Sequence, residues 1–172
     1  NLMTRHNVVE MASFCKEQGA TVIVGGPEPS NYPEEYLSRG ADLVVVGEGE
    51  RTLEELLPHL QAHGPAGDAR HIHGLIYRGA DGALVHTPER AQIKALAAQP
   101  FPDRAAIDLP RYVDVWRTHH GTGSVSLITA RGCPYKCKWC SHAVFGYTHR
   151  LRSPQNVAAE LEAILHTYRP EI

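Results

Sequence analysis

Short apolar runs alternate with amphipathic stretches along the first third of the chain. The runs at 21–24 and 43–46 are almost wholly apolar, which is typical of strands buried in a parallel sheet. Helical spacing of apolar residues predicts helices over 8–16 and 52–60, and a first-turn proline opens a short helix over 33–37. The order helix, strand, helix, strand, helix predicts a partial doubly wound α/β sheet. The apolar residues expected to face the core from the two longer helices are Val8, Met11, Ala12 and Cys15, then Leu53, Leu56, Leu57 and Leu60.

The pattern changes after a polar stretch at 63–68, which reads as a linker or loop. Two short apolar runs, 75–77 and 83–85, flank a glycine-containing turn and predict a β-hairpin. Further on, residues 124–129 alternate as a strand that leads directly into a cysteine-rich loop. Ser153 then supplies an N-cap for a helix whose expected apolar face holds Val157, Leu161, Ile164 and Leu165.

Composition places the chain among ordinary globular proteins. Of its 172 residues 42% are hydrophobic, which is enough for the core of one or two small units. The 17 Lys and Arg residues nearly balance 19 Asp and Glu residues, so no global charge recruits nucleic acid or an anionic membrane. No apolar run approaches the roughly 18 residues that span a bilayer, and the first residues lack the apolar core of a signal peptide. A cytoplasmic location is therefore expected.

Three of the four cysteines, Cys133, Cys137 and Cys140, lie within eight residues of one another. Such close spacing closes no useful disulfide loop, so ligation explains it better. On a loop after a strand the thiols can converge on one iron–sulfur cluster, and three thiolates on a four-iron cluster leave one iron open to a substrate. Zinc is the alternative metal, with His142 as a fourth ligand. Cys15 is expected to be a small core residue.

The run from Ala130 to Cys140 resembles the radical S-adenosylmethionine superfamily, whose hallmark is CxxxCxxC with an aromatic residue before the last cysteine. The resemblance implies that Cys133, Cys137 and Cys140 ligate a [4Fe–4S] cluster. In that family the open iron chelates S-adenosylmethionine, and electron transfer cleaves the cosubstrate reductively to a 5′-deoxyadenosyl radical. The resemblance also implies that Trp139 lies beside the adenine and that an electron donor such as flavodoxin or ferredoxin is a partner.

The cysteines lie in a segment that has no acidic residue between Asp114 and Glu160. Positive surroundings favour a thiolate-ligated cluster and the carboxylate of its cosubstrate. A solvated basic face explains any single one of these residues about as well. An RNA-binding patch is a weaker interpretation, because six charges with few interleaved aromatic residues make a small footprint. The six basic residues are Arg117, Arg131, Lys136, Lys138, Arg150 and Arg152.

Glycine-rich turns follow both predicted parallel strands, at the carboxyl ends where doubly wound folds bind ligands. Neither turn is a phosphate-binding loop, and Glu48 would repel a phosphate, so an uncharged, amide-rich ligand fits better. Tight turns with a first-turn acid are the alternative explanation. The runs 22–27 and 41–50 resemble the second half of the cobalamin-binding domain that precedes many radical S-adenosylmethionine domains. The resemblance implies that the cobalamin contacts are Gly25, Gly26, Gly47 and Glu48.

Together these resemblances predict three parts: the C-terminal part of a Rossmann-like cobalamin-binding domain at 1–65, a connector with the hairpin at 66–122, and the first β/α unit of a partial TIM-like (β/α) barrel at 123–172. They imply a cobalamin-dependent enzyme, a methyltransferase or cyclase, that methylates or rearranges an unactivated carbon of a small-molecule or lipid-like substrate. The chain is expected to be a fragment, inactive alone. The alternatives are an RNA-modifying radical enzyme and a non-catalytic zinc-stabilised module. The DxHxxG motif of some cobalamin domains is absent, and no histidine is assigned as a lower ligand.

Overall fold

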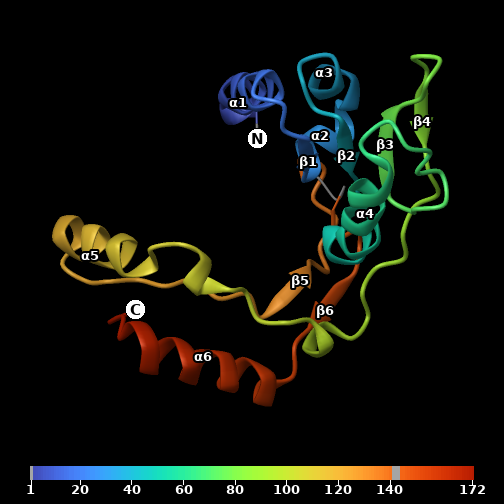
Figure 1. Cartoon of the computed structure of the whole chain (residues 1–172). Coiled ribbons are helices and arrows are strands. Elements are labelled where there is room, and N and C mark those ends of the chain that lie inside the picture. Colours follow the sequence, from blue (N-terminus) through green and yellow to red (C-terminus); the bar gives the residue numbers. More distant parts are fainter. Residues whose placement is uncertain (1, 141–143) are drawn as a thin grey trace. The chain divides into compact units, whose positions relative to one another are not determined.

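The first two strands of the chain pair in parallel, as the two apolar runs predict. In the computed structural model, which describes residues 2–140 and 144–172, β1 (Ile23–Gly25) and β2 (Leu43–Val45) pair in parallel, with Ile23 opposite Leu43 (Figure 1). All three residues of β2 are buried, which explains why its sequence is continuously apolar. The prediction of two neighbouring parallel strands is confirmed.

The predicted hairpin extends the same sheet. Strands β3 (Leu75–Arg78) and β4 (Leu84–His86) pair antiparallel, and β3 also pairs antiparallel with β2, giving the order β1-β2-β3-β4. Because Val44 lies opposite Ile76 in this register, the hairpin completes the hydrogen bonding of β2 on its second side. The sheet is therefore mixed, whereas the sequence predicted a parallel one.

Helices cover both faces of this sheet. On one face Val44 packs with residues of α1 (Arg5–Glu17) and α3 (Pro33–Leu37). On the other face, Leu43 and Val45 pack against α4 (Gly49–His63). The alternation of side chains along β2 sends successive residues to opposite layers. Two further elements, the 3₁₀ turn η1 (Leu2–Thr4) and helix α2 (Pro27–Asn31), were not predicted.

In helices α1 and α4, three side chains expected in the core are exposed. Cys15 is exposed, Met11 is 66% exposed, and Leu57 is 55% exposed. In α1 the buried residues are Val9 and Ala12, because the helix turns this narrower stripe toward the sheet. Apolar spacing indicated both helices correctly, but it could not define which residues of the wide apolar arc touch the sheet.

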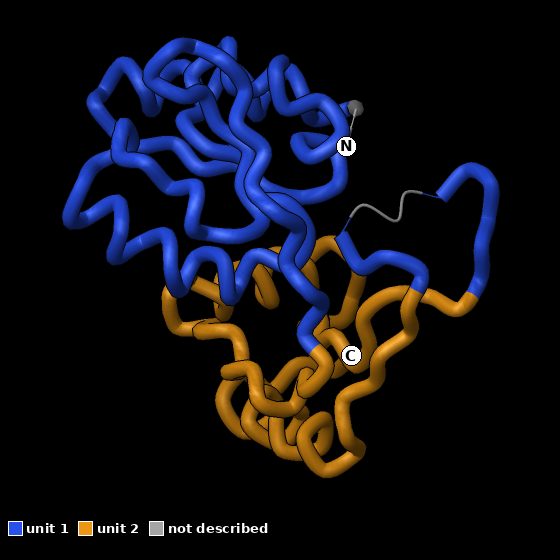
Figure 2. Tube along the Cα trace, turned by 90° about the vertical axis from the view of Figure 1, so that its right-hand side faces the viewer, with its two compact units in different colours: residues 1–93, 135–147 blue, residues 94–134, 148–172 orange. Residues whose placement is uncertain are grey.

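The chain divides into two compact units, residues 1–93 with 135–147, and residues 94–134 with 148–172 (Figure 2). The sheet and its helices belong to the first. The elements of the second are η2 (Leu96–Ala98), η3 (Arg104–Ala106), α5 (Leu109–His120), β5 (Ala130–Gly132), β6 (His149–Leu151) and α6 (Pro154–Tyr168). The boundaries expected at residues 65 and 122, and the barrel, stay predictions. No helix of the described residues is long and apolar enough to cross a membrane.

The second unit departs from the predicted strand at 124–129. The strand forms later in the chain, as β5, and pairs antiparallel with β6, so that Ala130 lies opposite Leu151. Over 124–129 the described backbone makes scattered bonds, from Val125 N to Ile172 O (3.0 Å) and from Arg152 N to Thr129 O (2.9 Å). A strand requires a continuous ladder with a neighbour, and alternation alone does not supply one.

A buried carboxylate organises the second unit. Glu160, on α6, is 1% exposed and accepts hydrogen bonds from Arg104 (2.7 Å) and Arg152. Burial alone would raise the pKa of Glu160, but the hydrogen bonds from the two guanidinium groups outweigh it and lower the pKa. The N-cap prediction is confirmed, since Ser153 Oγ accepts from Asn156 N (3.2 Å). Of the expected apolar face, Ile164 is buried on the same side of α6 as Glu160, whereas Leu161 and Leu165 are exposed.

Candidate functional site

The two glycine turns lie side by side at one edge of the sheet. Gly25, the last residue of β1, is opposite Val45, the last residue of β2. No heavy atom lies within 4 Å of the position that a Cβ would take at Gly26. Gly47 has φ +76°, a backbone conformation that favours glycine. The main chain at both turns is therefore open to close approach by a ligand.

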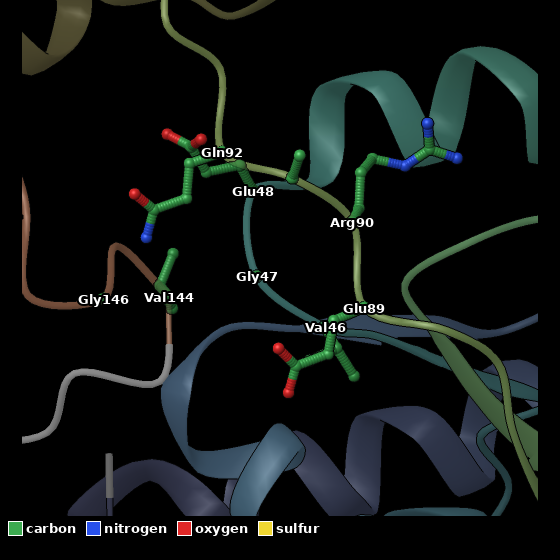
Figure 3. Close-up of a pocket in the computed structure, with 9 residues that line it drawn as sticks. Val46, Gly47, Glu48, Glu89, Arg90, Gln92, Val144 and Gly146 are labelled. Atoms are coloured by element: carbon green, nitrogen blue, oxygen red, sulfur yellow. The ribbon is translucent and has the colours of Figure 1, made fainter.

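A cavity of about 260 Å³ opens at the turn after β2 (Figure 3). Gly47 and Glu48 line it, as the sequence predicts for ligand contacts, whereas Gly25 and Gly26 are not among its lining residues. The other walls come from two distant stretches of the same unit. The full lining is Val46, Gly47, Glu48, Glu89, Arg90, Ala91, Gln92, Val144 and Gly146.

Glu48 joins the turn to one of these stretches. It is only 7% exposed, and its Oε2 accepts a hydrogen bond from Ile93 N at 2.7 Å. A buried carboxylate needs such donors, because the loss of hydration is otherwise costly. This Glu48 oxygen is therefore used to hold the protein's own backbone. Residues 89–93 were not predicted as part of the site, because they form an irregular stretch with no motif.

Arg90 fastens the same stretch to α4. Its guanidinium donates two hydrogen bonds to Glu55 (2.8 and 2.6 Å), and its Nε donates to the buried Thr52 hydroxyl (3.0 Å). The hydrogen bonds from Arg90 lower the pKa of Glu55 below its usual value of 4.5, against a smaller opposing effect of burial. Figure 3 shows the Arg90 side chain directed toward the helix and Gln92 directed toward Val144.

The cysteine loop presents its thiols to solvent. Cys133, Cys137 and Cys140 are all exposed, and Cys140 N donates to Cys137 O at 3.1 Å in a tight turn. Cys133 belongs to the second unit, and the other two belong to the first. Across residues 2–140 and 144–172, no three His, Cys, Asp or Glu side chains are arranged to hold a metal ion. Convergence of the three thiols stays a prediction, and His142 lies outside the described residues.

Trp139, which precedes Cys140 in the sequence, is exposed like the thiols, with 88% of its surface accessible. An exposed aromatic ring between two accessible thiols is available to a ligand bound at the loop. The adenine contact expected of Trp139 is not tested by this geometry and stays a prediction. The donor set nevertheless suits iron, because soft thiolates are the ligands that iron–sulfur clusters use.

Carboxylates neutralise part of the predicted basic segment. Arg117 pairs with Glu171 at 2.9 Å, and Arg152 pairs with Glu160. Hydrogen bonds from Arg117 and from Gly123 N lower the pKa of Glu171 to about 2. Glu160 ends the acid-free stretch and Glu171 lies beyond it, yet both pair with its arginines. The net positive charge of the stretch is therefore smaller than its sequence suggests. This arrangement reduces the positive charge that an RNA-binding surface would need.

Comparison with known proteins finds a domain match and several relatives. Residues 3–57, from η1 to the middle of α4, match the B12 binding domain. Over 94% of its length the chain is 26% identical to an uncharacterized methyltransferase of Synechocystis sp., of which it covers 25%. Over 72% of its length it is 29% identical to the anaerobic magnesium-protoporphyrin IX monomethyl ester cyclase of Rubrivivax gelatinosus, of which it covers 22%. The chain thus carries a B12 binding domain match and is similar to cobalamin-dependent radical S-adenosylmethionine enzymes.

Solved structures show the fold of this family over nearly the whole chain. The radical S-adenosylmethionine methyltransferase TsrM from Kitasatospora setae matches with a TM-score of 0.69 and 22% identity, covering 95% of this chain and 31% of that one. The cobalamin-dependent radical enzyme OxsB matches with a TM-score of 0.72 and 23% identity, covering 95% of this chain and 22% of that one. The chain spans about a quarter of the length of the two relatives named above.

Proposed function

We propose that this chain supplies the cobalamin-binding region and the cluster-binding loop of a cobalamin-dependent methyltransferase or cyclase. The observation that carries the proposal is the combination of two features in one chain. The B12 binding domain match includes both glycine turns, and Cys133-x3-Cys137-x2-Cys140 follows it. Either feature alone occurs in other settings, but the radical relatives combine them.

The turns after β1 and β2 fit part of a corrinoid. Gly26 and Gly47 leave the main chain open, and the cavity beside Gly47 is large enough for peripheral groups of the ligand rather than for the whole molecule. Glu48 and Glu89 make its lining acidic, which disfavours a phosphate and favours a neutral or cationic group. We assign Gly25, Gly26, Gly47 and Glu48 as the cobalamin-facing edge of the sheet.

The cysteine loop fits a [4Fe–4S] cluster. Cys133, Cys137 and Cys140 would each ligate one iron, which leaves the fourth iron for S-adenosylmethionine, and the exposed Trp139 ring would lie against the adenine. Together the bound cofactors would supply a 5′-deoxyadenosyl radical for hydrogen abstraction and a methyl group for transfer. An electron donor such as flavodoxin or ferredoxin would provide the reducing electron.

The substrate of the whole protein is proposed to be a small or lipid-like molecule with an unactivated carbon. Names of the relatives support this class, since they include methyltransferases and a cyclase that acts on a porphyrin ester. The pairing of Arg117 and Arg152 with carboxylates argues against RNA as the substrate.

The test is to purify the full-length parent protein anaerobically and to measure iron, cobalt and 5′-deoxyadenosine release in the same preparation. We expect about four irons per chain, bound cobalamin, and S-adenosylmethionine cleavage that depends on a reductant. Iron and cleavage without cobalt would refute the cobalamin assignment. A colourless protein that binds zinc would refute the cluster assignment.

A further inference from the structure

Residues 88–93, here called the strap, run from the hairpin across the turn that follows β2. They are anchored at three points. Gly74 N donates to Pro88 O at 2.9 Å, the Arg90 guanidinium binds Glu55, and Ile93 N donates to Glu48. A segment without regular secondary structure is usually mobile unless its polar groups are paired in this way. These contacts hold the strap in one position.

The anchors hold the part of the strap that lines the cavity. All four residues from 89 to 92 line the cavity, but the Arg90 guanidinium turns away to α4, whereas Gln92 is directed toward Val144 (Figure 3). The anchors therefore determine which strap side chains a ligand meets.

Gln92 has room in the cavity only because glycine stands opposite it. A Cβ at Gly146 would collide with Nε2 of Gln92. A carboxamide both donates and accepts hydrogen bonds, so it can pair with the primary amides around a corrin ring in either orientation. Its neighbours Glu48 and Glu89 would select against an anionic ligand. The strap thus has the chemistry of a wall for an amide-rich ligand.

We propose that the strap is the selective wall of the corrinoid pocket, in which Gln92 contacts the ligand amides while Glu48 and Arg90 are positioning residues. The proposal rests on the cobalamin binding proposed above. It changes the role of Glu48, because its carboxylate acts through the backbone of Ile93. It also extends the cobalamin site beyond the residues 3–57 that match the B12 binding domain, into the connector.

The experiment uses the full-length parent protein with Glu48→Ala, Glu48→Gln and Gln92→Leu variants. Glu17→Ala, which removes an exposed glutamate of α1, is the matched control. Hydrogen exchange of residues 89–93 in the cobalamin-free protein reports how firmly the strap is held. Visible absorbance titration with hydroxocobalamin reports the affinity of the pocket. Neither measurement depends on catalysis.

In Glu48→Ala we expect exchange in the strap to rise about tenfold and hydroxocobalamin affinity to fall about tenfold, since a charge-assisted hydrogen bond is lost. Glu48→Gln keeps an acceptor for Ile93 N, so its strap exchange and its hydroxocobalamin affinity should lie between those of Glu48→Ala and of the unsubstituted protein. Gln92→Leu keeps the shape of the side chain, so exchange should stay unchanged while affinity falls about threefold to tenfold. The control should match the unsubstituted protein in both measurements.

Each contrary result would overturn one part of the proposal. Unchanged exchange in Glu48→Ala would show that Glu48 does not position the strap. Raised exchange with unchanged affinity would show that the strap is no wall of the pocket, and unchanged affinity in Gln92→Leu would remove Gln92 from the ligand contacts. If the unsubstituted protein fails to bind hydroxocobalamin, the proposed function fails and the selective role with it, whereas the exchange data still decide the role of Glu48.

Discussion

At the scale of single residues, Gly74 shows how closely the turn after β2 approaches the start of β3. Its φ is +80°, and a Cβ there would lie 3.0 Å from Thr52 Oγ1 and 3.2 Å from Val46 O. Both residues are held by hydrogen bonds, since Thr52 Oγ1 accepts from Arg90 Nε and Val46 N donates to Gly74 O. Neither can move aside without breaking a bond.

Replacing Gly74 by alanine should therefore destabilise the protein by about 2–3 kcal/mol, from backbone strain and from the tight contacts together. Gly82→Ala is the matched control, because Gly82 has φ +79° but no heavy atom within 4 Å of a Cβ. The control should lose only the strain, about 1 kcal/mol. Urea unfolding of both variants measures the difference, and equal losses would contradict the steric part of the explanation.

Glu171 gives the second unit a pH-dependent ion pair. Its pKa is lowered from 4.5 to about 2, first by Arg117 and then by Gly123 N. A carboxyl group with a lowered pKa in the folded state stabilises that state fully above its ordinary pKa. The stabilisation is lost as the pH falls toward the folded value.

The stability difference between the unsubstituted protein and Glu171→Gln should therefore be constant above about pH 5 and should vanish between about pH 4.5 and pH 2. Denaturant unfolding at a series of pH values measures it. An increase of this stability difference on acidification would contradict the prediction.

At the scale of elements, helix α6 buries a charged residue, Glu160, together with Ile164 of its apolar stripe. Glu160 turns inward to Arg104 and Arg152, and the leucines at 161 and 165 face outward. Arg152 also donates to Ile128 O at 2.7 Å, so one ionic centre connects the helix with the chain before β5. Such a centre specifies the orientation of a helix more narrowly than apolar burial does.

Removing this carboxylate should weaken the second unit strongly. In Glu160→Ala the two guanidinium groups would remain close together without their shared partner, and we expect a loss of about 3–5 kcal/mol. The control is Glu162→Ala, an exposed position on the same helix, where the change should stay within about 0.5 kcal/mol. Hydrogen exchange of the α6 amides reports this unit separately, and similar exchange in the two variants would contradict the prediction.

At the scale of the whole molecule, the chain offers its own control for the cysteine loop. All four cysteines are exposed, but Cys15 lies on α1, well away in sequence from the other three. Exposure and chemical type are therefore matched, and only the CxxxCxxC context differs. This allows ligation to be separated from nonspecific binding of iron to thiols.

After anaerobic reconstitution with iron and sulfide, Cys137→Ala should lose most of the cluster absorbance and reduce bound iron from about four per chain to less than one. Cys15→Ala should keep both, because that thiol has no partner thiols nearby in sequence. Loss of iron in both variants alike would refute specific ligation by the loop.

Much of the fold was predictable because it depends on local pattern. The continuous apolar run at Leu43–Val45 indicated a strand buried on both faces, and Ser153 indicated the start of α6. The two glycine turns and the cysteine spacing are also local, so the family could be inferred from them and the B12 binding domain match agrees. Local patterns failed where they had to choose a face, as at Met11 and Leu57.

The sequence by itself determined the two parallel strands, the hairpin, most of the longer helices, the glycine turns and the cysteine motif, since each depends on residues within a few positions of one another. Only the tertiary structure decided the mixed sheet, the strap and the orientation of α6. These depend on hydrogen bonds between residues far apart in the chain: 45 positions for Glu48 and Ile93, and 56 for Arg104 and Glu160. No periodicity encodes such partners, because they are chosen when the packed elements bring buried charges and backbone groups together.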